Sequence, residues 1–346
     1  MGKRATLTDV ARLAGLSPSS VSLILNNKPD TRLSDDARRR VKEAVEVLGY
    51  RPNVAARSLV TNRTQTIALI TDHVATTRFG SGLVKGTLSE ANERDHVVLL
   101  LETDGDDQQA IKAVSAVLDR QVDGIIFSTS RAREMNVPTT PSGMKVVMLN
   151  ATNSKHELTV LPDEFAGGKS VVELLKKAGH DRGIVLLGQN DQVEKDVYRS
   201  VTISSRIKGM RSAMLDSGFQ FLEEVAVKIW EPEDGYKATK KLLSGPAKDH
   251  ITAIICINDR LAFGAYQAIV EQGMSIPSDI SIASFDNDEV AAYLRPGLTT
   301  IENPYEEMGA AAVRLLLDGD SGQSVQVPMK LVERASISAP REVRYS

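Results

Sequence analysis

From residue 64 onward, short continuous apolar runs alternate with amphipathic segments of helical spacing. Continuous apolar runs are typical of strands buried on both faces, and such strands belong to parallel sheets whose helical crossovers cover both sides. This rhythm constrains the fold more than any other feature, because it predicts an α/β architecture. The strands are expected at 66–71, 96–102, 122–128, 145–149, 182–188, 224–230, 252–257 and 280–285.

The expected strands are too numerous for one compact sheet. The β-α-β rhythm restarts near Gly183, which indicates two similar lobes with a cleft between them. Ligands of such folds bind where the carboxyl ends of the strands meet. The helices between the strands are expected at 80–95, 108–121, 165–180, 205–218 and 259–273.

The first 63 residues contain three short helical patterns instead. Thr6 and Asp9 have the spacing of a capping box at the start of the first helix. Gly15 can adopt a positive φ in the turn that follows this helix. The next stretch, "SPSSVSLILNN", begins with Ser17 as a good N-cap and Pro18 at the first helical position. It predicts a second helix too short to be stable alone.

The third helical pattern begins after Ser34 and ends at Gly49. Two helices joined by a tight turn, with a third packed across them, form a helix-turn-helix domain, and its second helix enters the major groove of DNA. Val21, Ile24 and Leu25 would anchor that helix, while its small hydroxyl side chains approach the bases. A three-helix bundle that binds nothing has the same periodicity and is the alternative.

The charge distribution favours the DNA-binding interpretation over that alternative. The net charge of the chain is −3, yet residues 1–63 carry 12 Lys and Arg against 6 Asp and Glu, and the rest carries 30 against 39. A basic head on an acidic body suggests that the head meets a polyanion. A basic solvated surface without a partner would give the same count, so charge alone does not decide.

Residues 50–63, "YRPNVAARSLVTNR", form a segment with no evident core of its own. Pro52 and Asn53 open a helical turn, and Leu59 lies among small residues close to Arg57. An apolar side chain presented by a basic segment is what a minor-groove wedge requires. The segment is therefore expected to order against DNA, with a plain interdomain linker as the alternative.

The stretch "TLTDVARLAGLSPSSVSLILNN", followed by "LSDDARRRVKEAVEVLGYRPNVAARSL", resembles the DNA-binding head and hinge of the LacI/GalR (lactose/galactose repressor) family. The resemblance continues through "AIICINDRLAFGAYQAI", "SIPSDISIASFDN", "RPGLTTIENPYEEMGAAAVRLLL" and "LVERASISAP". It implies a periplasmic-binding-protein-like core, and homodimers that bind near-palindromic operator DNA. It also implies that the hinge helix around 53–60 folds on the operator, where Leu59 from each subunit pries open a base step.

The expected DNA contacts depart from the family pattern at one position. The family commonly has Arg after the Val-Ser of the recognition helix, whereas this chain has Leu23, and Pro18 offers no side-chain donor. Hydrogen-bonded readout is therefore expected to be sparse, with apolar contacts and DNA shape contributing more. The expected DNA-binding residues are Thr6, Ser17, Pro18, Ser19, Ser20, Ser22, Leu23, Asn26, Tyr50, Asn53, Ala56, Arg57 and Leu59.

Polar side chains follow several of the expected strands. Asn258, Asp286 and Asp163 each come after an apolar run, Arg206 begins a helix, and Trp230 is the only tryptophan. Carboxylates and amides hydrogen-bond hydroxyl groups, and an aromatic ring covers the apolar face of a sugar or a base. Individually, such residues could equally be helix caps. Together they predict a site for a polyhydroxylated ligand.

The family resemblance carries effector contacts onto Arg206, Asn258 and Asp286, and places Trp230 where relatives often have a ligand-stacking aromatic. Thr77, Arg78 and Phe79 match the loop that usually closes over the ligand, although the family more often has Pro and aromatic residues there. Arg78 would add a positive charge, so phosphorylated sugars and acidic ligands remain open. The expected effector is a sugar, a polyol or a sugar phosphate, and a nucleoside or nucleobase is the alternative.

Signatures of catalysis, cofactors and metals are missing from the sequence. The stretch "GGKS" resembles the end of a phosphate loop, but that motif requires glycine where this chain has Asp163. No secretory signal is evident, and the single cysteine, Cys256, fits a reducing compartment. We therefore expect a cytoplasmic regulator that is not an enzyme and needs no cofactor or metal. A solute-binding transport protein is the alternative from another class, and it would have no use for the basic head.

The expected organisation has three parts. The fold is α/β, with an all-α head joined by a hinge helix to a two-lobed core of parallel sheets. The parts are 1–50 (helix-turn-helix domain), 51–64 (hinge helix and linker) and 65–346 (effector-binding and dimerisation core), whose first lobe takes about 65–161 and 290–325 and whose second takes about 162–289 and 326–346.

Overall fold

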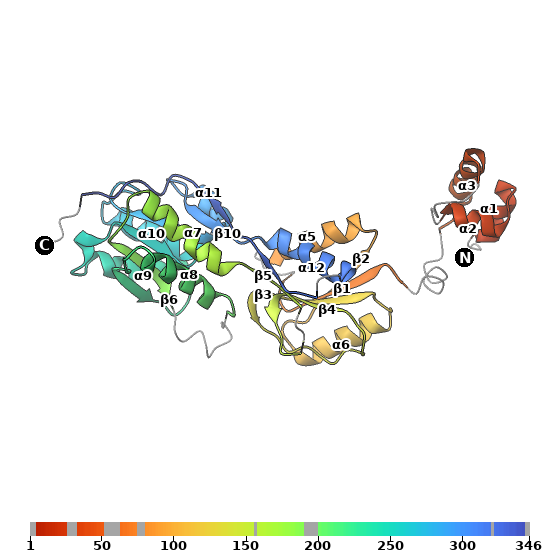
Figure 1. Ribbon diagram of the computed structural model, residues 1–346, viewed down its shortest axis with the longest axis horizontal. Helices are drawn as coiled ribbons and strands as arrows, with labels where there is room; N and C mark the ends of the chain where they lie inside the picture. The colour runs from red at the N-terminus through yellow and green to blue at the C-terminus, as the bar shows by residue number, and fades with distance from the viewer. Residues whose placement is uncertain are drawn as a thin grey trace. The chain divides into compact units, whose positions relative to one another are not determined.

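A computed structural model describes residues 5–25, 33–51, 63–74, 80–155, 158–189, 200–319 and 322–342. The chain divides into two compact units, Met1–Thr64 and Gln65–Ser346, and each is described separately below (Figure 1). This division coincides with the predicted boundary between the hinge and the core. No helix within the described ranges is long and apolar enough to span a bilayer.

The first unit contains the three predicted helices, α1 (Leu7–Ala14), α2 (Pro18–Leu25) and α3 (Asp35–Leu48). The capping box at the start of α1 is confirmed, because the Thr6 side chain accepts from the Asp9 backbone and the Asp9 carboxylate accepts from the Thr6 backbone. Gly15 adopts the left-handed conformation at φ 67°, as the predicted turn requires. The three helices share a small core made of Val10, Ala11, Ala14, Val21, Ile24, Ala37, Val41 and Ala44.

The first lobe of the second unit is a six-stranded parallel sheet in the order β11-β5-β4-β3-β1-β2. Alternate residues of β1 face opposite sides, so Ile67 packs under helices α5 and α12, and Ala68 packs over α6. Figure 1 shows α5 and α12 on one side of the sheet and α6 on the other. The bounds are β1 Thr66–Thr71, α5 Gly80–Glu93, β2 Val97–Glu102, α6 Asp107–Leu118, β3 Gly124–Glu134, β4 Val146–Thr152, β5 Thr159–Pro162, α12 Tyr305–Asp318 and β11 Val325–Val327.

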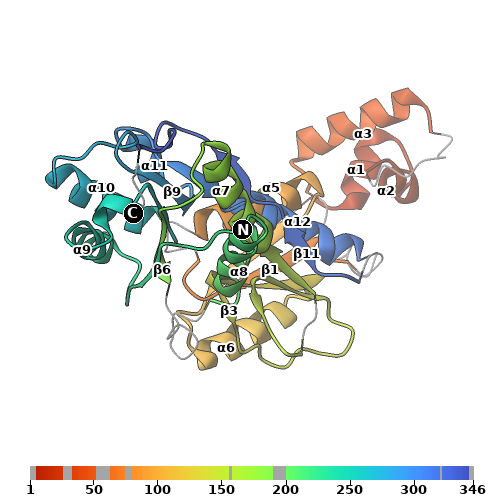
Figure 2. The same cartoon turned by 60° about the vertical axis from the view of Figure 1, so that its left-hand side comes forward.

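The second lobe is a six-stranded sheet in the order β12-β10-β9-β8-β6-β7, parallel except for the pairing of β10 with β12. Helices α7 and α8 pack together, as do α9 and α10, with the strands between the two pairs (Figure 2). Cys256 lies fully buried on β8, as a small apolar filler. The bounds are α7 Glu164–Lys177, β6 Ile184–Gln189, α8 Ile203–Leu215, β7 Glu223–Ala226, α9 Pro232–Leu243, η2 Lys248–His250, β8 Ala253–Cys256, α10 Asp259–Glu271, β9 Ser281–Asp286, α11 Glu289–Tyr293, β10 Thr299–Glu302 and β12 Lys330–Val332.

The predicted two-lobed α/β core is confirmed, but several of its predicted bounds are wrong. The strand expected at 122–128, for example, continues to Glu134 as β3. The strand expected at 224–230 ends at Ala226, so Trp230 lies in the connection to α9. The chain returns to the first lobe only after β10, rather than near residue 290, because α11 and β10 complete the second sheet. It therefore crosses between the lobes three times, after β5, after β10 and after β11.

Two glycines allow α7 and α8 to approach each other closely. A Cβ added at Gly168 would lie 2.2 Å from the carbonyl oxygen of Arg206, and one at Gly209 would lie 2.1 Å from that of Phe165. Both distances are far below van der Waals contact, so only glycine fits at either position. This close crossing brings the start of α7 beside the side chains of α8 that face the other lobe.

Candidate functional site

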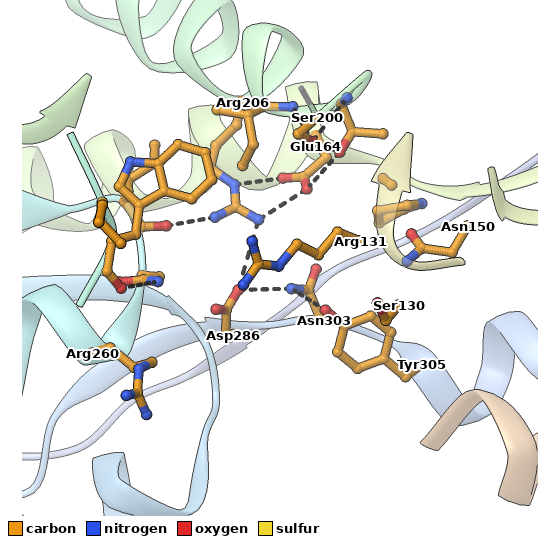
Figure 3. A pocket seen from close by; sticks show the side chains of 18 of the residues that line it. Ser130, Arg131, Asn150, Glu164, Ser200, Arg206, Arg260, Asp286, Asn303 and Tyr305 are labelled. Atoms are coloured by element: carbon orange, nitrogen blue, oxygen red, sulfur yellow. Dashed lines mark hydrogen bonds and ion pairs between the residues drawn. The ribbon is translucent and has the colours of Figure 1, made fainter. Parts of the chain in front are cut away.

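A cavity lies where residues of the two lobes face each other within the second unit (Figure 3). Its volume of about 130 Å³ is below the roughly 300–1,000 Å³ typical of pockets for drug-sized ligands, which favours a small molecule. Strand and helix ends from both sheets supply its walls, as expected for a site at the carboxyl edges of parallel strands. The residues that line it are Ser130, Arg131, Ala132, Asn150, Pro162, Glu164, Ser200, Thr202, Ile203, Arg206, Lys228, Ile229, Trp230, Glu231, Ile257, Asn258, Arg260, Asp286, Asn303 and Tyr305.

Arg206 is the most deeply buried charged residue of this wall, with only 2% of its side chain exposed. Its Nε donates to Glu164 Oε2 at 2.6 Å, and its Nη2 donates to Glu164 Oε1 at 2.9 Å. Its Nη1 donates to the carbonyl oxygen of Ile257 at 2.6 Å, and the ring of Phe285 lies 4.2 Å from its guanidinium carbon. A guanidinium that makes a bidentate pair with a carboxylate and stacks on an aromatic ring has a fixed orientation.

Asp286 ends β9 and faces Arg206, with Oδ1 3.9 Å from the Arg206 Nη2. The same oxygen accepts a hydrogen bond from the Asn303 Nδ2 at 2.7 Å, and that Nδ2 also donates to the Tyr305 hydroxyl at 3.2 Å. Burial, opposed in part by Arg206, raises the pKa of Asp286 to about 7. The backbone φ of 105° at Asp286 is a conformation that L-residues rarely adopt, and such strain is common at binding sites.

A second buried carboxylate supports the turn that contains Asp286. Asp259 is fully buried, accepts from the Thr300 hydroxyl at 2.8 Å and accepts from the Asp288 backbone at 2.7 Å. Burial raises the pKa of Asp259 to about 6. These hydrogen bonds tie the end of β9 to β10 and α10, and so fix the turn that presents Asp286.

Trp230 and Asn258 form the opposite part of the second-lobe wall. The indole Nε1 donates to the carbonyl oxygen of Gly188 at 2.9 Å, which fixes the ring of Trp230 against β6. Asn258 accepts from the Leu261 backbone at 2.9 Å and so caps α10, while its Nδ2 donates to the Trp230 carbonyl oxygen at 3.2 Å. Asn258 is therefore both a helix cap and a cavity residue.

The first lobe contributes polar groups from the ends of β3 and β4. Asn150 donates to the Thr129 carbonyl oxygen at 3.0 Å, while the Thr129 hydroxyl donates to the Asn150 carbonyl oxygen at 2.5 Å. The backbone N–H of Ser130 donates to the buried carboxylate of Asp72 at 2.9 Å. These contacts hold the first-lobe wall in place, and Arg131 extends from it over the cavity (Figure 3).

Four of the predicted effector residues, Arg206, Trp230, Asn258 and Asp286, line this cavity. Asp163 is not among the lining residues, because its carboxylate accepts from the Ala166 backbone at 3.0 Å and caps α7. The lining residue is its neighbour Glu164, which the sequence reasoning missed together with Asn303, Tyr305 and Arg131. Thr77, Arg78 and Phe79 lie outside the described residues.

The predicted recognition helix α2 is anchored as expected by Val21 and Ile24, which are buried, and by Leu25, which packs partly against them. The Ser17 hydroxyl accepts from the Ser20 backbone at 3.1 Å and lies 2.9 Å from the Ser20 hydroxyl.

The other predicted DNA-binding residues differ in exposure. Thr6, Ser17, Pro18 and Ser19 are exposed, Ser20, Ser22 and Leu23 are half-buried, and Tyr50 packs partly against the core of the head. Asn26, Asn53, Ala56, Arg57 and Leu59 lie outside the described residues.

Comparisons with known proteins decide the family. Residues 6–53 match the model of bacterial regulatory proteins of the lacI family, and residues 172–337 match a periplasmic binding protein-like domain. The ribose operon repressor of Escherichia coli K12 is 30% identical over 345 residues, covering 96% of this chain and 99% of that protein. The chain belongs to the LacI family.

Solved structures of LacI-family proteins agree with this assignment. The lac repressor dimer, bound to operator and to the anti-inducer ONPF, superimposes with a TM-score of 0.71 at 25% identity, covering 97% of this chain and 100% of that chain. A LacI-family regulator from Enterococcus faecium with bound ribose superimposes with a TM-score of 0.60 at 26% identity, covering 80% of this chain and all of the other. The superposition on the lac repressor thus includes nearly all of this chain.

Proposed function

We propose that this LacI-family protein is a sequence-specific transcriptional repressor whose affinity for operator DNA is controlled by a small polar effector bound between the core lobes. The observation that carries the proposal is the cavity in which Arg206, Asp286 and Asn258 meet Trp230, on a chain that also has a helix-turn-helix head. Convergent hydrogen-bonding groups beside one aromatic ring suit a polyhydroxylated ligand. A nucleoside or nucleobase is the alternative effector class.

A sugar-like effector is further supported by two relatives. One is the E. coli ribose operon repressor, and the other is the E. faecium regulator with bound ribose. The proposed effector is therefore a sugar, a polyol or a sugar phosphate. As a cytoplasmic regulator without catalytic function, the protein would respond to the ligand by binding it rather than converting it.

In the proposed mechanism, two copies of the chain bind the two halves of a near-palindromic operator. The described surface offers exposed apolar side chains that suit such a homodimer, including Leu88 on α5 and Val97 and Leu100 on the edge strand β2. The effector would shift the angle between the lobes, and with it the order of the hinge at 51–64. Coupling of about 1–3 kcal/mol, typical of two-site systems, corresponds to roughly 5–150-fold in operator affinity.

The effector proposal is tested by titration of ribose, other pentoses and hexoses, polyols, sugar phosphates and nucleosides into the purified protein. The readout is the fluorescence of Trp230, the single tryptophan of the chain, supported by calorimetry. We expect at least one polyhydroxylated compound to bind and to change the mobility shift of operator DNA selected from a random library. Binding of nucleosides alone would move the assignment to the alternative class, and a protein that selects no DNA sequence would refute the repressor assignment.

A further inference from the structure

The binding capacity of Arg206 is limited by the carboxylate of Glu164. A guanidinium has five N–H groups, and three of those of Arg206 are already donated, two to Glu164 and one to the Ile257 carbonyl oxygen. The two remaining N–H groups belong to Nη1 and Nη2. A ligand can therefore receive hydrogen bonds from Arg206, but the positive charge that would attract an anion is already paired inside the protein wall.

Glu164 is as buried as its partner, with 3% of its side chain exposed, so water screens this ion pair only weakly. The Thr202 hydroxyl donates to Glu164 Oε1 at 3.4 Å, which adds a further contact to this carboxylate. Asp286 lies on the cavity side of Arg206. The deep end of the cavity thus holds two carboxylates and one guanidinium.

The other cationic side chains of the lining are placed differently. Arg260 pairs with Glu231, with its Nε 2.6 Å from Oε2. Arg131 and Lys228 are exposed, so their charges are hydrated and screened by salt. In the view of Figure 3, Arg131 points toward Asp286. An anion placed against Arg206 would lie beside the carboxylates of Glu164 and Asp286.

We propose that Glu164 determines the charge class of the effector: by neutralising Arg206 it makes the cavity accept uncharged polyhydroxyl compounds and reject phosphorylated or carboxylated ones. This inference rests on the proposed function, and it removes sugar phosphates from the range of effectors left open above. The raised pKa of Asp286 agrees with it, because the neighbouring Arg206 only partly offsets the effect of burial and Glu164 adds to the rise. Glu164 acts through Arg206 and is a positioning residue rather than a direct ligand contact.

Glu164 could serve only to hold α7 and α8 together through its ion pair with Arg206. Such a structural role makes a different prediction from a role in ligand selectivity. If the ion pair only holds the helices together, its removal destabilises the protein without changing which ligands bind. Removing a charge selector exposes the guanidinium to anions. The test therefore uses inorganic phosphate as the probe, with sodium chloride at equal ionic strength as the reference, and measures affinity by calorimetry and Trp230 fluorescence.

The variants are Glu164→Gln, which removes the charge, Glu164→Asp, which keeps it, and Glu233→Gln as a matched control. Glu233 is exposed on α9 and pairs with Lys237, so its neutralisation changes the net charge equally without touching the cavity. We expect Glu164→Gln to bind phosphate at least tenfold more tightly than the wild type, which corresponds to about 1.4 kcal/mol. The Glu164→Asp and Glu233→Gln variants should behave like the wild type.

Equal phosphate affinity in the wild type and in Glu164→Gln, at any level, would overturn the inference. So would a gain of similar size in Glu233→Gln. If Glu164→Gln does not fold, the wild type alone still decides. A dissociation constant for phosphate of about 1 mM or tighter, or equal affinity for ribose and ribose 5-phosphate in a wild-type protein that binds ribose, refutes the role of Glu164. Failure of every neutral sugar to bind would refute the proposed effector class instead. The phosphate comparison does not depend on sugar binding, so the two failures can be told apart.

Discussion

Replacing Asp286 with asparagine should stabilise the ligand-free protein in a pH-dependent way. Burial raises the pKa of Asp286 to about 7 from an ordinary value of 3.8. The folded state therefore holds the proton more tightly than the unfolded state, and stability falls as pH rises through this window. Above it, keeping the carboxylate ionised costs up to about 4 kcal/mol. Asparagine resembles the protonated form and also tolerates the positive φ of 105° at this position.

The attraction of Arg206, whose Nη2 lies 3.9 Å from Asp286 Oδ1, is already contained in this pKa. Because 15% of the Asp286 side chain is exposed, contact with water keeps the cost below that upper value. We therefore expect Asp286→Asn to raise the free energy of unfolding by about 1–3 kcal/mol at about pH 8. The gain should be clearly smaller at about pH 5, where the wild-type carboxyl is protonated in the folded state but still ionised in the unfolded state. Urea unfolding followed by Trp230 fluorescence measures both values. The same variant should bind the effector more weakly, because it loses an anionic acceptor for hydroxyl groups.

The matched control is Glu289→Gln, an exposed carboxylate three residues further along the chain. It should change stability by less than about 0.5 kcal/mol at either pH. A gain from Asp286→Asn that is equal at both pH values would show that ionisation is not its cause. A loss of stability at the higher pH would refute the reasoning about burial altogether.

Three further substitutions test the head, the hinge and the core. Leu59→Ala should weaken operator binding by at least about tenfold while leaving the effector titration unchanged, as a lost minor-groove wedge requires; unchanged operator affinity would eliminate the wedge. Leu23→Arg should strengthen DNA binding and steepen the fall of the DNA-binding constant with salt concentration by about the amount expected for one added phosphate contact. Mobility shift at several salt concentrations measures this slope, and an unaltered slope would place residue 23 away from DNA. Gly168→Ala should cost about 1–3 kcal/mol or more of stability and impair effector binding, because the added Cβ would collide with the backbone of Arg206; a stable variant with normal binding would contradict the close crossing of α7 and α8.

The long elements of the fold could be predicted because their patterns are local. The apolar run at 66–71 coincides with β1, and the head helices follow from caps such as Thr6 with Asp9. Short strands such as β11 (Val325–Val327) were missed, because three residues carry no pattern of their own and form a strand only by pairing with β5. The short strand β10 (Thr299–Glu302) was missed for the same reason, so the return of the chain to the first lobe was expected near residue 290, which is too early.

The site was predictable only where a residue follows a strong strand. Asp286 and Asn258 were found in this way, whereas Asn303 and Tyr305 lie at a crossing between lobes that the sequence pattern did not reveal. Asp163 and Glu164 are neighbours at the start of α7, and no local pattern tells which one caps the helix and which one faces Arg206. That choice depends on where α8 packs, which is a property of the tertiary structure.

The three crossings between the lobes also constrain when each lobe can fold while the chain is being synthesised on the ribosome. The first lobe needs α12 and β11, whose last residue is Val327, and these follow the strands β6 to β10 of the second lobe along the chain. Until they emerge, apolar residues of the first sheet such as Ile67 and Leu69 lack α12, one of the two helices that cover them. The second sheet in turn lacks β12. Neither lobe can therefore finish folding before nearly the whole chain has been made, and a premature stop before β11 leaves both sheets incomplete.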